Sequence, residues 1–234
     1  MVADERITAG PRGRFITFEG GEGAGKSTQI KLLADRLAAA NVRAVVTREP
    51  GGSPGAEIMR HLVLSGIGKI LGANAETLLF AAARADHVGL VIEPSLSHGV
   101  WVLCDRFSDS TRAYQGSLGQ VETRLIDALE RVTIDGLRPD LTFVLDLPVE
   151  TGLGRAAKRR GATAPDRFEA ENIDFHQKLR DAYRRIVSDN PQRCVLIDAA
   201  AEAEMVAARI WQVAQERFVE LTPQPNSNTR AARA

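Results

Sequence analysis

Cysteine is almost absent from this chain of 234 residues, in which it occurs at Cys104 and Cys194 alone. Two cysteines without a CxxC pairing provide neither a disulfide framework nor a zinc site. We therefore expect two buried thiols in a protein of the reducing cytosol.

The chain also lacks an excess of charge and long apolar runs. Thirty basic residues balance thirty acidic ones and the sequence pI is near 6.9, which argues against binding to nucleic acid or to an anionic membrane. No run is long enough to span a bilayer, and residues 1–13 carry charges and glycine where a secretory signal would have an apolar core. We expect a cytoplasmic protein in which residues 1–13 form an N-terminal extension.

What the sequence does contain is a glycine-rich loop, Gly20-Gly21-Glu22-Gly23-Ala24-Gly25-Lys26-Ser27, followed by Thr28. It fits the pattern G-x-x-x-x-G-K-[ST] at every fixed position and lies between an apolar run and a helix-like segment. Its backbone N–H groups can wrap a polyphosphate, because glycine adopts conformations that a Cβ forbids. We expect Lys26 to reach the terminal phosphates, Ser27 to bind Mg²⁺, and the start of the helix to face the same anion. The chain is therefore predicted to bind a nucleoside triphosphate.

Helix-like and strand-like segments alternate along the rest of the chain. Helical spacing of apolar residues occurs at about 26–40, 54–65, 73–90, 122–133, 168–187 and 201–218, and strand-like runs occur at 15–18, 43–47, 100–104, 141–145 and 194–197. This alternation predicts an α/β fold with an open, five-stranded parallel sheet flanked by helices. Its ligands should gather at the carboxyl edge of the strands. Residues 221–234 lack periodicity, and we expect a disordered tail there.

Two carboxylates compete for a place beside the metal. Asp105 and Asp146 each follow a buried-strand run, so either could bind Mg²⁺ next to Ser27 or cap a neighbouring turn. Arg106 favours Asp105, because a guanidinium directly after the metal-side carboxylate can bind a phosphate that the glycine loop does not hold. The pair predicts an acceptor that is itself phosphorylated.

Four motifs occur in a recognisable order along the chain. They are Phe18-Glu19-Gly20 with the loop, Thr47-Arg48-Glu49-Pro50-Gly51-Gly52, Asp105-Arg106-Phe107 and Ala113-Tyr114-Gln115-Gly116. From about residue 14 to residue 218 the chain thereby resembles the thymidylate kinase family. The resemblance implies a P-loop nucleoside monophosphate kinase domain over 14–220 with a short lid near 152–167. It also implies a homodimer that phosphorylates dTMP to dTDP with MgATP, in the biosynthesis of dTTP.

The resemblance implies which residues hold the base of the acceptor. Phe80 corresponds to the aromatic residue that stacks on thymine, and Arg84 to the arginine that hydrogen-bonds the base. Together with His87 they are spaced to share one helix face. Without the resemblance, Phe80 would be taken for a core aromatic and Arg84 for a solvated charge.

The resemblance also implies which residues hold the sugar and the phosphate of the acceptor. Arg48 and Arg106 correspond to the family's monophosphate-binding arginines, and Tyr114 to a tyrosine that crowds out a ribonucleotide near the 2′ position. Ser110 and Thr111 correspond to polar residues near the base or the phosphate, and Thr111 is the weaker match. From the sequence alone, Tyr114 would be a packing residue.

The loop contains an acidic residue and no basic one before Lys26. The resemblance implies that Glu22 contacts the acceptor's sugar hydroxyl or the arginine network. The cation for the transferring phosphoryl group must then come from elsewhere, as in the bacterial type that carries its catalytic arginine in the lid. Candidates are Lys158, Arg159, Arg160 and Arg167. The sequence does not choose between Arg159 and Arg160, and composition alone would also fit a solvated basic helix face.

The acceptor determines the expected chemistry. A nucleoside monophosphate is already ionised, since its second pKa is about 6, so no strong general base is needed. We expect Asp105 to organise metal and water, while Lys26, Arg106 and a lid arginine neutralise the transferring group.

Two other functions compete with this interpretation. The nearest is a kinase for another nucleoside monophosphate or for a deoxynucleoside, and Arg48 and Arg106 argue against the deoxynucleoside. The second is a P-loop GTPase-type switch protein, against which the missing [NT]KxD element argues.

Overall fold

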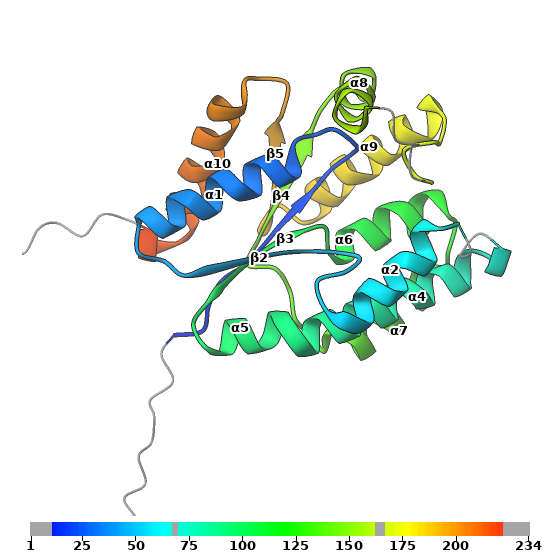
Figure 1. Ribbon diagram of the computed structural model, residues 1–234, viewed down its shortest axis with the longest axis horizontal. Helices are drawn as coiled ribbons and strands as arrows, with labels where there is room; N and C mark the ends of the chain where they lie inside the picture. Colours follow the sequence, from blue (N-terminus) through cyan, green and yellow to red (C-terminus); the bar gives the residue numbers. More distant parts are fainter. Residues whose placement is uncertain (1–10, 67–69, 162–166, 222–234) are drawn as a thin grey trace, which may run out of the picture.

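A computed structural model describes residues 11–66, 70–161 and 167–221 (Figure 1). The described residues form a five-stranded parallel sheet in the order β2-β3-β1-β4-β5, as the alternation of elements predicts. The strands are β1 (Phe15–Glu19), β2 (Ala44–Arg48), β3 (Trp101–Asp105), β4 (Leu141–Asp146) and β5 (Cys194–Asp198). Most of the N-terminal extension expected over 1–13, part of the lid expected near 152–167 and nearly all of the tail expected over 221–234 lie outside the described residues.

Helices cover both faces of the sheet. The α-helices are α1 (Lys26–Ala39), α2 (Pro54–Leu64), α4 (Ala73–His87), α5 (Glu93–Ser97), α6 (Ser108–Thr111), α7 (Thr123–Ile134), α8 (Val149–Arg160), α9 (Ile173–Asp189) and α10 (Ala203–Arg217). The π-helical turns η1 (Val88–Ile92) and η2 (Arg112–Leu118) and the 3₁₀ turn η3 (Val219–Leu221) complete the list. None of the helices in these segments is long and apolar enough to cross a membrane.

Burial follows the position of each strand in the sheet. The central strand β1 is buried along its whole length, whereas the edge strand β2 is half-buried or exposed throughout and the edge strand β5 mixes buried, half-buried and exposed positions. One core lies between the sheet, α1 and α10, and a second lies between the opposite face, η1, α5 and α7. Figure 1 shows α1 and α10 on one side of the strands and α5 and α7 on the other. Strands covered on both faces need the continuous apolar runs that the sequence contains.

The parallel arrangement places the ends of three neighbouring strands at one edge. Phe18 pairs with Asp105 and Glu19 pairs with Val144, so β1, β3 and β4 end close to one another. The phosphate-binding loop follows β1 at this edge. Cys104 and Cys194 are buried free thiols, as expected.

Several boundaries differ from the sequence-based expectations. The helix expected over 73–90 continues through η1 and α5 to Ser97, since Pro94 lies in the first turn of α5, where its missing N–H is tolerated. The helix expected over 168–187 begins only at Ile173, where the Asn172 side chain accepts a hydrogen bond of 2.8 Å from Phe175 N. The described start of the expected lid, up to residue 160, belongs to α8.

Candidate active site

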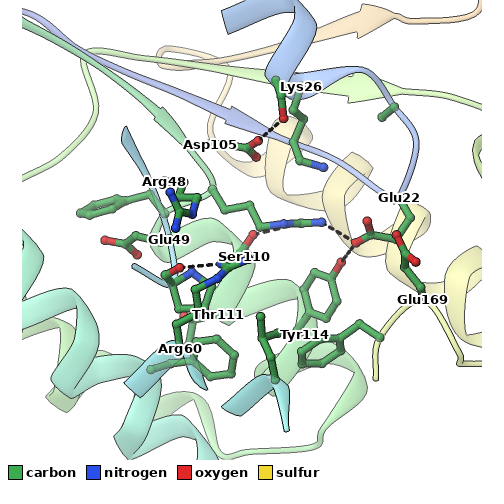
Figure 2. A pocket seen from close by; sticks show the side chains of 18 of the residues that line it. Glu22, Lys26, Arg48, Glu49, Arg60, Asp105, Ser110, Thr111, Tyr114 and Glu169 are labelled. Carbon is green, nitrogen blue, oxygen red and sulfur yellow. Dashed lines mark hydrogen bonds and ion pairs between the residues drawn. The ribbon is translucent and has the colours of Figure 1, made fainter. Parts of the chain in front are cut away.

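A cavity of about 470 Å³ opens at the carboxyl edge of the sheet. Most of the predicted site residues line it: Glu22, Gly23, Ala24, Gly25, Lys26, Ser27, Thr28, Arg48, Phe80, Arg84, Asp105, Arg106, Ser110, Thr111, Tyr114 and Arg159. Gly20 and Gly21 line a much smaller cavity behind the loop, and Arg160 does not line the cleft. Figure 2 shows Lys26 and Asp105 on one side of the cleft, with Thr111 and Tyr114 across from them. The fold therefore brings distant motifs together in one space of a size typical of small-molecule sites.

The glycine loop packs against the start of α8. A Cβ at Gly23, where φ is +66°, would lie 2.0 Å from the carbonyl oxygen of Gly152, so this position requires glycine. Lys26 is buried, and its Nζ donates to the carbonyls of Gly20 and Gly21 at 3.1 and 3.0 Å. Burial lowers the pKa of Lys26 because the charged form loses water. The ammonium is thus held along the loop in which the sequence predicts the phosphates to bind.

The two carboxylates that end β3 and β4 have different partners. Ser27 Oγ donates to Asp105 Oδ2 at 2.9 Å. Asp146 instead accepts from Arg180, at 2.7 and 2.9 Å, and from Arg184 at 2.7 Å. Burial acts to raise the pKa of Asp146, but these two guanidinium groups hold it below its ordinary value. Asp146 therefore anchors α9, while Asp105 lies beside the loop.

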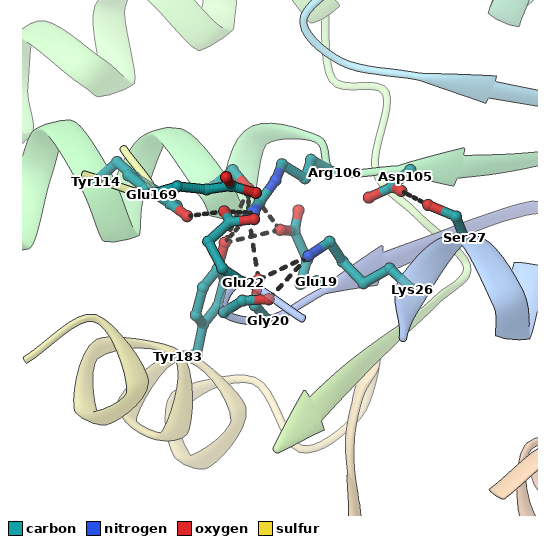
Figure 3. Close-up of polar contacts among 12 residues, drawn as sticks. Glu19, Gly20, Glu22, Lys26, Ser27, Asp105, Arg106, Tyr114, Glu169 and Tyr183 are labelled. Carbon is teal, nitrogen blue, oxygen red and sulfur yellow. Dashed lines mark hydrogen bonds and ion pairs between the residues drawn. The ribbon is translucent and has the colours of Figure 1, made fainter. Parts of the chain in front are cut away.

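Arg106 lies between the loop and the rest of the cleft. Its backbone has a φ of +70°, and its guanidinium donates to Glu22 Oε1 at 2.6 Å and to Gly20 O and Tyr183 Oη at 3.1 Å each. The guanidinium also lies 5.2 Å from the centre of the Tyr114 ring. Figure 3 shows these contacts converging on the guanidinium. Of the two roles expected for Glu22, the structure contains the contact with the arginine network.

The opposite end of the cleft contains the residues predicted to hold a base. Arg84 is buried; its Nε donates to Glu49 at 2.7 Å and its Nη2 donates to Thr111 Oγ1 at 3.0 Å. Glu49 also contacts His87 Nδ1 at 3.1 Å. Arg84 is therefore not a solvated charge but a fixed donor, and it shares a helix face with His87 and Phe80, as the spacing predicts.

Aromatic side chains from distant segments meet at this end. The ring of Phe168 stands edge-on to Tyr114 with centroids 5.1 Å apart, and it lies 6.5 Å from Phe80. Tyr114 Oη donates to Glu22 at 3.3 Å, and burial raises the pKa of its phenol. Tyr114 thus links the aromatic end of the cleft to the loop.

The arginines near the expected lid separate by position. Arg159 lines the cleft with a side chain that is 65% exposed, and its Nη2 lies 3.5 Å from Glu169 Oε1. Arg160 is 24% exposed and donates to Glu169 Oε2 at 2.7 Å. Arg167 pairs with the buried carboxylate of Glu76, away from the loop. Lys158 is exposed on α8 and does not line the cleft. Among the four candidates, Arg159 alone lines the cleft, and it is more exposed and less closely paired with Glu169 than Arg160.

Sequence reasoning missed four residues that shape this site. Glu19 and Glu49 belong to motifs that the sequence shows. A carboxylate at the end of a strand that is expected to be buried indicates that hydrogen-bond donors or a cation must lie beside it. For Phe168 and Tyr183 no neighbouring residues in the sequence indicate a place in the site. They follow α7, β4 and α8 in the chain, and only the fold brings them back to the cleft.

Comparisons with known proteins agree with the motifs. A family model described as thymidylate kinase matches residues 18–210. The curated thymidylate kinase of Nitrobacter winogradskyi is 66% identical over 223 residues, covering 95% of each chain. That of Bradyrhizobium diazoefficiens is 69% identical over 216 residues, covering 92% of this chain and 93% of the relative. A crystal structure of thymidylate kinase from Ehrlichia chaffeensis superposes with a TM-score of 0.69 at 36% identity, covering 88% of this chain and 99% of the other.

Proposed function

This chain belongs to the thymidylate kinase family, and we propose that its cleft binds both nucleotides of the reaction with their phosphates meeting at Arg106. The reaction is the phosphorylation of dTMP to dTDP with ATP as donor, a step of nucleotide biosynthesis. One observation supports the proposal above the others: a single cavity joins the glycine loop to Phe80, Arg84 and Tyr114.

The loop end of the cleft suits a triphosphate and its metal. Mg²⁺ is usually held by one or two protein oxygens together with substrate phosphates and waters. Ser27 and Asp105, which are in contact at 2.9 Å beside the loop, supply two such oxygens, so the donor set fits the ion. When bound, Mg²⁺ would neutralise charge on the phosphates. Lys26 adds a second positive charge close by.

The other end suits a thymidine monophosphate. The flat face of Phe80 can stack on thymine, and Arg84 is held by Glu49 and Thr111 so that its remaining N–H groups can meet a base carbonyl. Tyr114 closes the side at which a 2′-hydroxyl would lie. Arg48 and Arg106 bind the phosphate.

In this arrangement the protein aligns two phosphates and removes no proton. An oxygen of the ionised dTMP phosphate attacks the γ-phosphorus of ATP, the bond from that phosphorus to ADP breaks, and dTDP and ADP leave. Charge on the transferring group is balanced by Lys26, Arg106 and Arg159. Asp105 holds its place beside Ser27 and is not a base.

A coupled assay of ADP release tests the proposal. dTMP, dUMP, dCMP, dGMP, AMP and thymidine are offered separately, and we expect dTMP to give the highest kcat/KM. Phe80→Ala should raise KM for dTMP by about tenfold or more while leaving KM for ATP unchanged. A preference for dCMP or thymidine would overturn the choice of acceptor.

We also propose that the chain forms a homodimer in the cytoplasm. Ile58 on α2, Leu78 on α4 and Val132 on α7 are 64%, 50% and 83% exposed, and α4 packs against both other helices. Exposed apolar side chains of this kind are suited to contact with a second copy. The buried free thiols suit a reducing compartment. Light scattering after size exclusion should give about twice 25.4 kDa, and a mass of one chain at micromolar concentration would contradict the dimer.

A further inference from the structure

We propose that Glu19 is the positioning residue for Arg106: its buried carboxylate fixes the turn after β3 and directs the hydroxyl groups that hold the guanidinium. The inference rests on the role proposed above for Arg106. Glu19 ends β1, is fully buried and does not line the cleft, so it can act on the phosphates only through another residue.

Glu19 holds the backbone of the turn that follows β3. Arg106 N donates to Phe18 O at 2.9 Å, which extends the ladder between β1 and β3 by one bond. At the next residue the chain turns away, and Phe107 N donates to Glu19 Oε1 at 2.7 Å. The φ of Arg106, +70°, lies in the left-handed region that residues with a Cβ rarely adopt. Glu19 thus supplies the acceptor that this turn would otherwise lack.

Glu19 also sets the direction of the hydrogen bonds around the Arg106 guanidinium. Ser110 Oγ donates to Glu19 Oε2 at 2.6 Å. Tyr183 Oη lies 3.1 Å from the same oxygen and 2.8 Å from Ser110 Oγ, and its proton goes to one of these two. Each hydroxyl has a single proton, and an ionised carboxylate only accepts. In either case the proton of Ser110 is directed at Glu19 and neither proton points at Arg106. The two hydroxyl oxygens are therefore left to accept from Arg106 Nη1, which lies 3.1 Å from Tyr183 Oη and 3.4 Å from Ser110 Oγ.

The surroundings of Glu19 are consistent with this role. Burial, with the nearby charge of Asp109, raises the pKa of Glu19 to about 7. The hydrogen bonds from Ser110 and Phe107 N and the charge of Arg106 oppose the rise, because all of them favour the ionised form. If this side chain only filled space, an apolar residue would do so without the free-energy cost of burying a carboxyl group.

The test is Glu19→Gln, assayed at pH 8. The amide has the same shape but brings two N–H donors, so at least one hydroxyl must turn its proton toward the guanidinium. We expect kcat to fall about 10- to 100-fold with KM for ATP unchanged. Glu19→Asp, which keeps the charge, should recover part of the loss.

Two controls separate positioning from a merely structural effect. Glu130→Gln removes the charge from another buried carboxylate, which pairs with Arg112 and Arg138 outside the cleft, and it should leave kcat unchanged even where it lowers the thermal midpoint. In the Arg106→Ala background, Glu19→Gln should cause no further loss, since the group that it positions is gone.

Each outcome decides the inference. A kcat within about twofold of wild type for Glu19→Gln, or an undiminished loss in the Arg106→Ala background, would overturn it. If Arg106→Ala itself retains normal turnover, the proposed role of Arg106 fails instead, whatever Glu19→Gln does. The two failures are therefore distinguishable in one set of variants.

Discussion

At the residue scale, two arginines of the cleft, Arg84 and Arg106, are held by carboxylates that are largely shielded from water. Glu22 binds Arg106 at 2.6 Å and Glu49 binds Arg84 at 2.7 Å. Taking such charges out of water is costly, and breaking a buried pair by removing one partner typically destabilises a protein by about 3–5 kcal/mol. The pairs fix two guanidinium groups before any ligand arrives, so that less ordering is required when a phosphate or a base binds.

The roles of Lys26 and Arg106 can be tested by truncation. Lys26→Ala and Arg106→Ala should each reduce kcat about 10²- to 10³-fold, the usual cost of removing one group that stabilises developing charge. Circular dichroism should show folded protein in both cases. Arg209→Ala, on the exposed side of α10, is the matched control and should retain wild-type turnover. Near-normal turnover in either cleft variant would refute the role of that residue.

Glu19 should also leave a signature in the pH dependence of stability. In the folded protein the pKa of Glu19 is raised to about 7, above the ordinary 4.5 of the unfolded chain. The contribution of Glu19 to the free energy of unfolding is therefore fully present below pH 4.5, where the side chain is protonated in both states, and it is lost as pH rises through about 7. The free energy of unfolding, from urea titrations at pH 5 and pH 8, should therefore fall on the order of 2 kcal/mol more in the wild type than in Glu19→Gln. Equal pH dependence in both proteins would contradict the raised pKa.

At the scale of elements, β3 and β4 end alike but lead into different structures. Asp105 and Asp146 each close a buried strand, yet the chain turns through Arg106 into α6 after β3 and enters α8 after β4. The carboxylate of Asp146 is occupied by two arginines of α9, and that of Asp105 lies against Ser27 at the start of α1. Asp105 and Asp146 thus have different roles because they contact different helices, α1 and α9.

A pair of matched variants tests this division. Asp105→Asn should raise the Mg²⁺ concentration for half-maximal rate by about tenfold or more, because it removes the negative charge of the carboxylate that we propose binds the ion. Asp146→Asn should leave that concentration unchanged and instead lower the free energy of unfolding by about 1–3 kcal/mol. A larger change of the Mg²⁺ dependence in Asp146→Asn would reverse the assignment.

The end of α8 supplies the second test at this scale. Arg159 lines the cleft, whereas Arg160 does not and is the arginine held more closely by Glu169. Arg159→Ala should therefore lower kcat about 10²-fold or more, with Arg160→Ala much closer to wild type. Single-turnover measurements of ADP formation separate the chemical step from product release. A larger loss for Arg160→Ala would show that the lid places the other arginine on the phosphates.

At the scale of the whole molecule, the sequence predicts the parts better than their arrangement. Apolar runs such as 100–104 and 141–145 indicate a parallel sheet, and the glycine loop indicates which end binds phosphate. The strand order is not readable, because pairing between β1 and β3 joins residues about ninety positions apart. Phe168 and Tyr183 were missed for the same reason: only the folded chain brings them to Tyr114 and Arg106.

Helix α8 shows how a functional demand can obscure a local signal. Gly152 and Gly154 weaken the helical pattern there, since glycine is a poor helix former. Gly152 is nevertheless required, because a Cβ at this residue would lie 2.4 Å from the carbonyl oxygen of Glu22. Helix α8 therefore contains a residue of low helix propensity at the point where the glycine loop packs closely against it.

The central claim is that one cleft holds two nucleotides with their phosphates facing each other. The most direct test is a crystal structure with dTMP and a non-hydrolysable ATP analogue. We predict the triphosphate on the backbone amides of residues 21–27, the dTMP phosphate at Arg106, and the thymine ring stacked on Phe80. Thymine bound away from Phe80, or a cleft that admits one nucleotide only, would contradict the account.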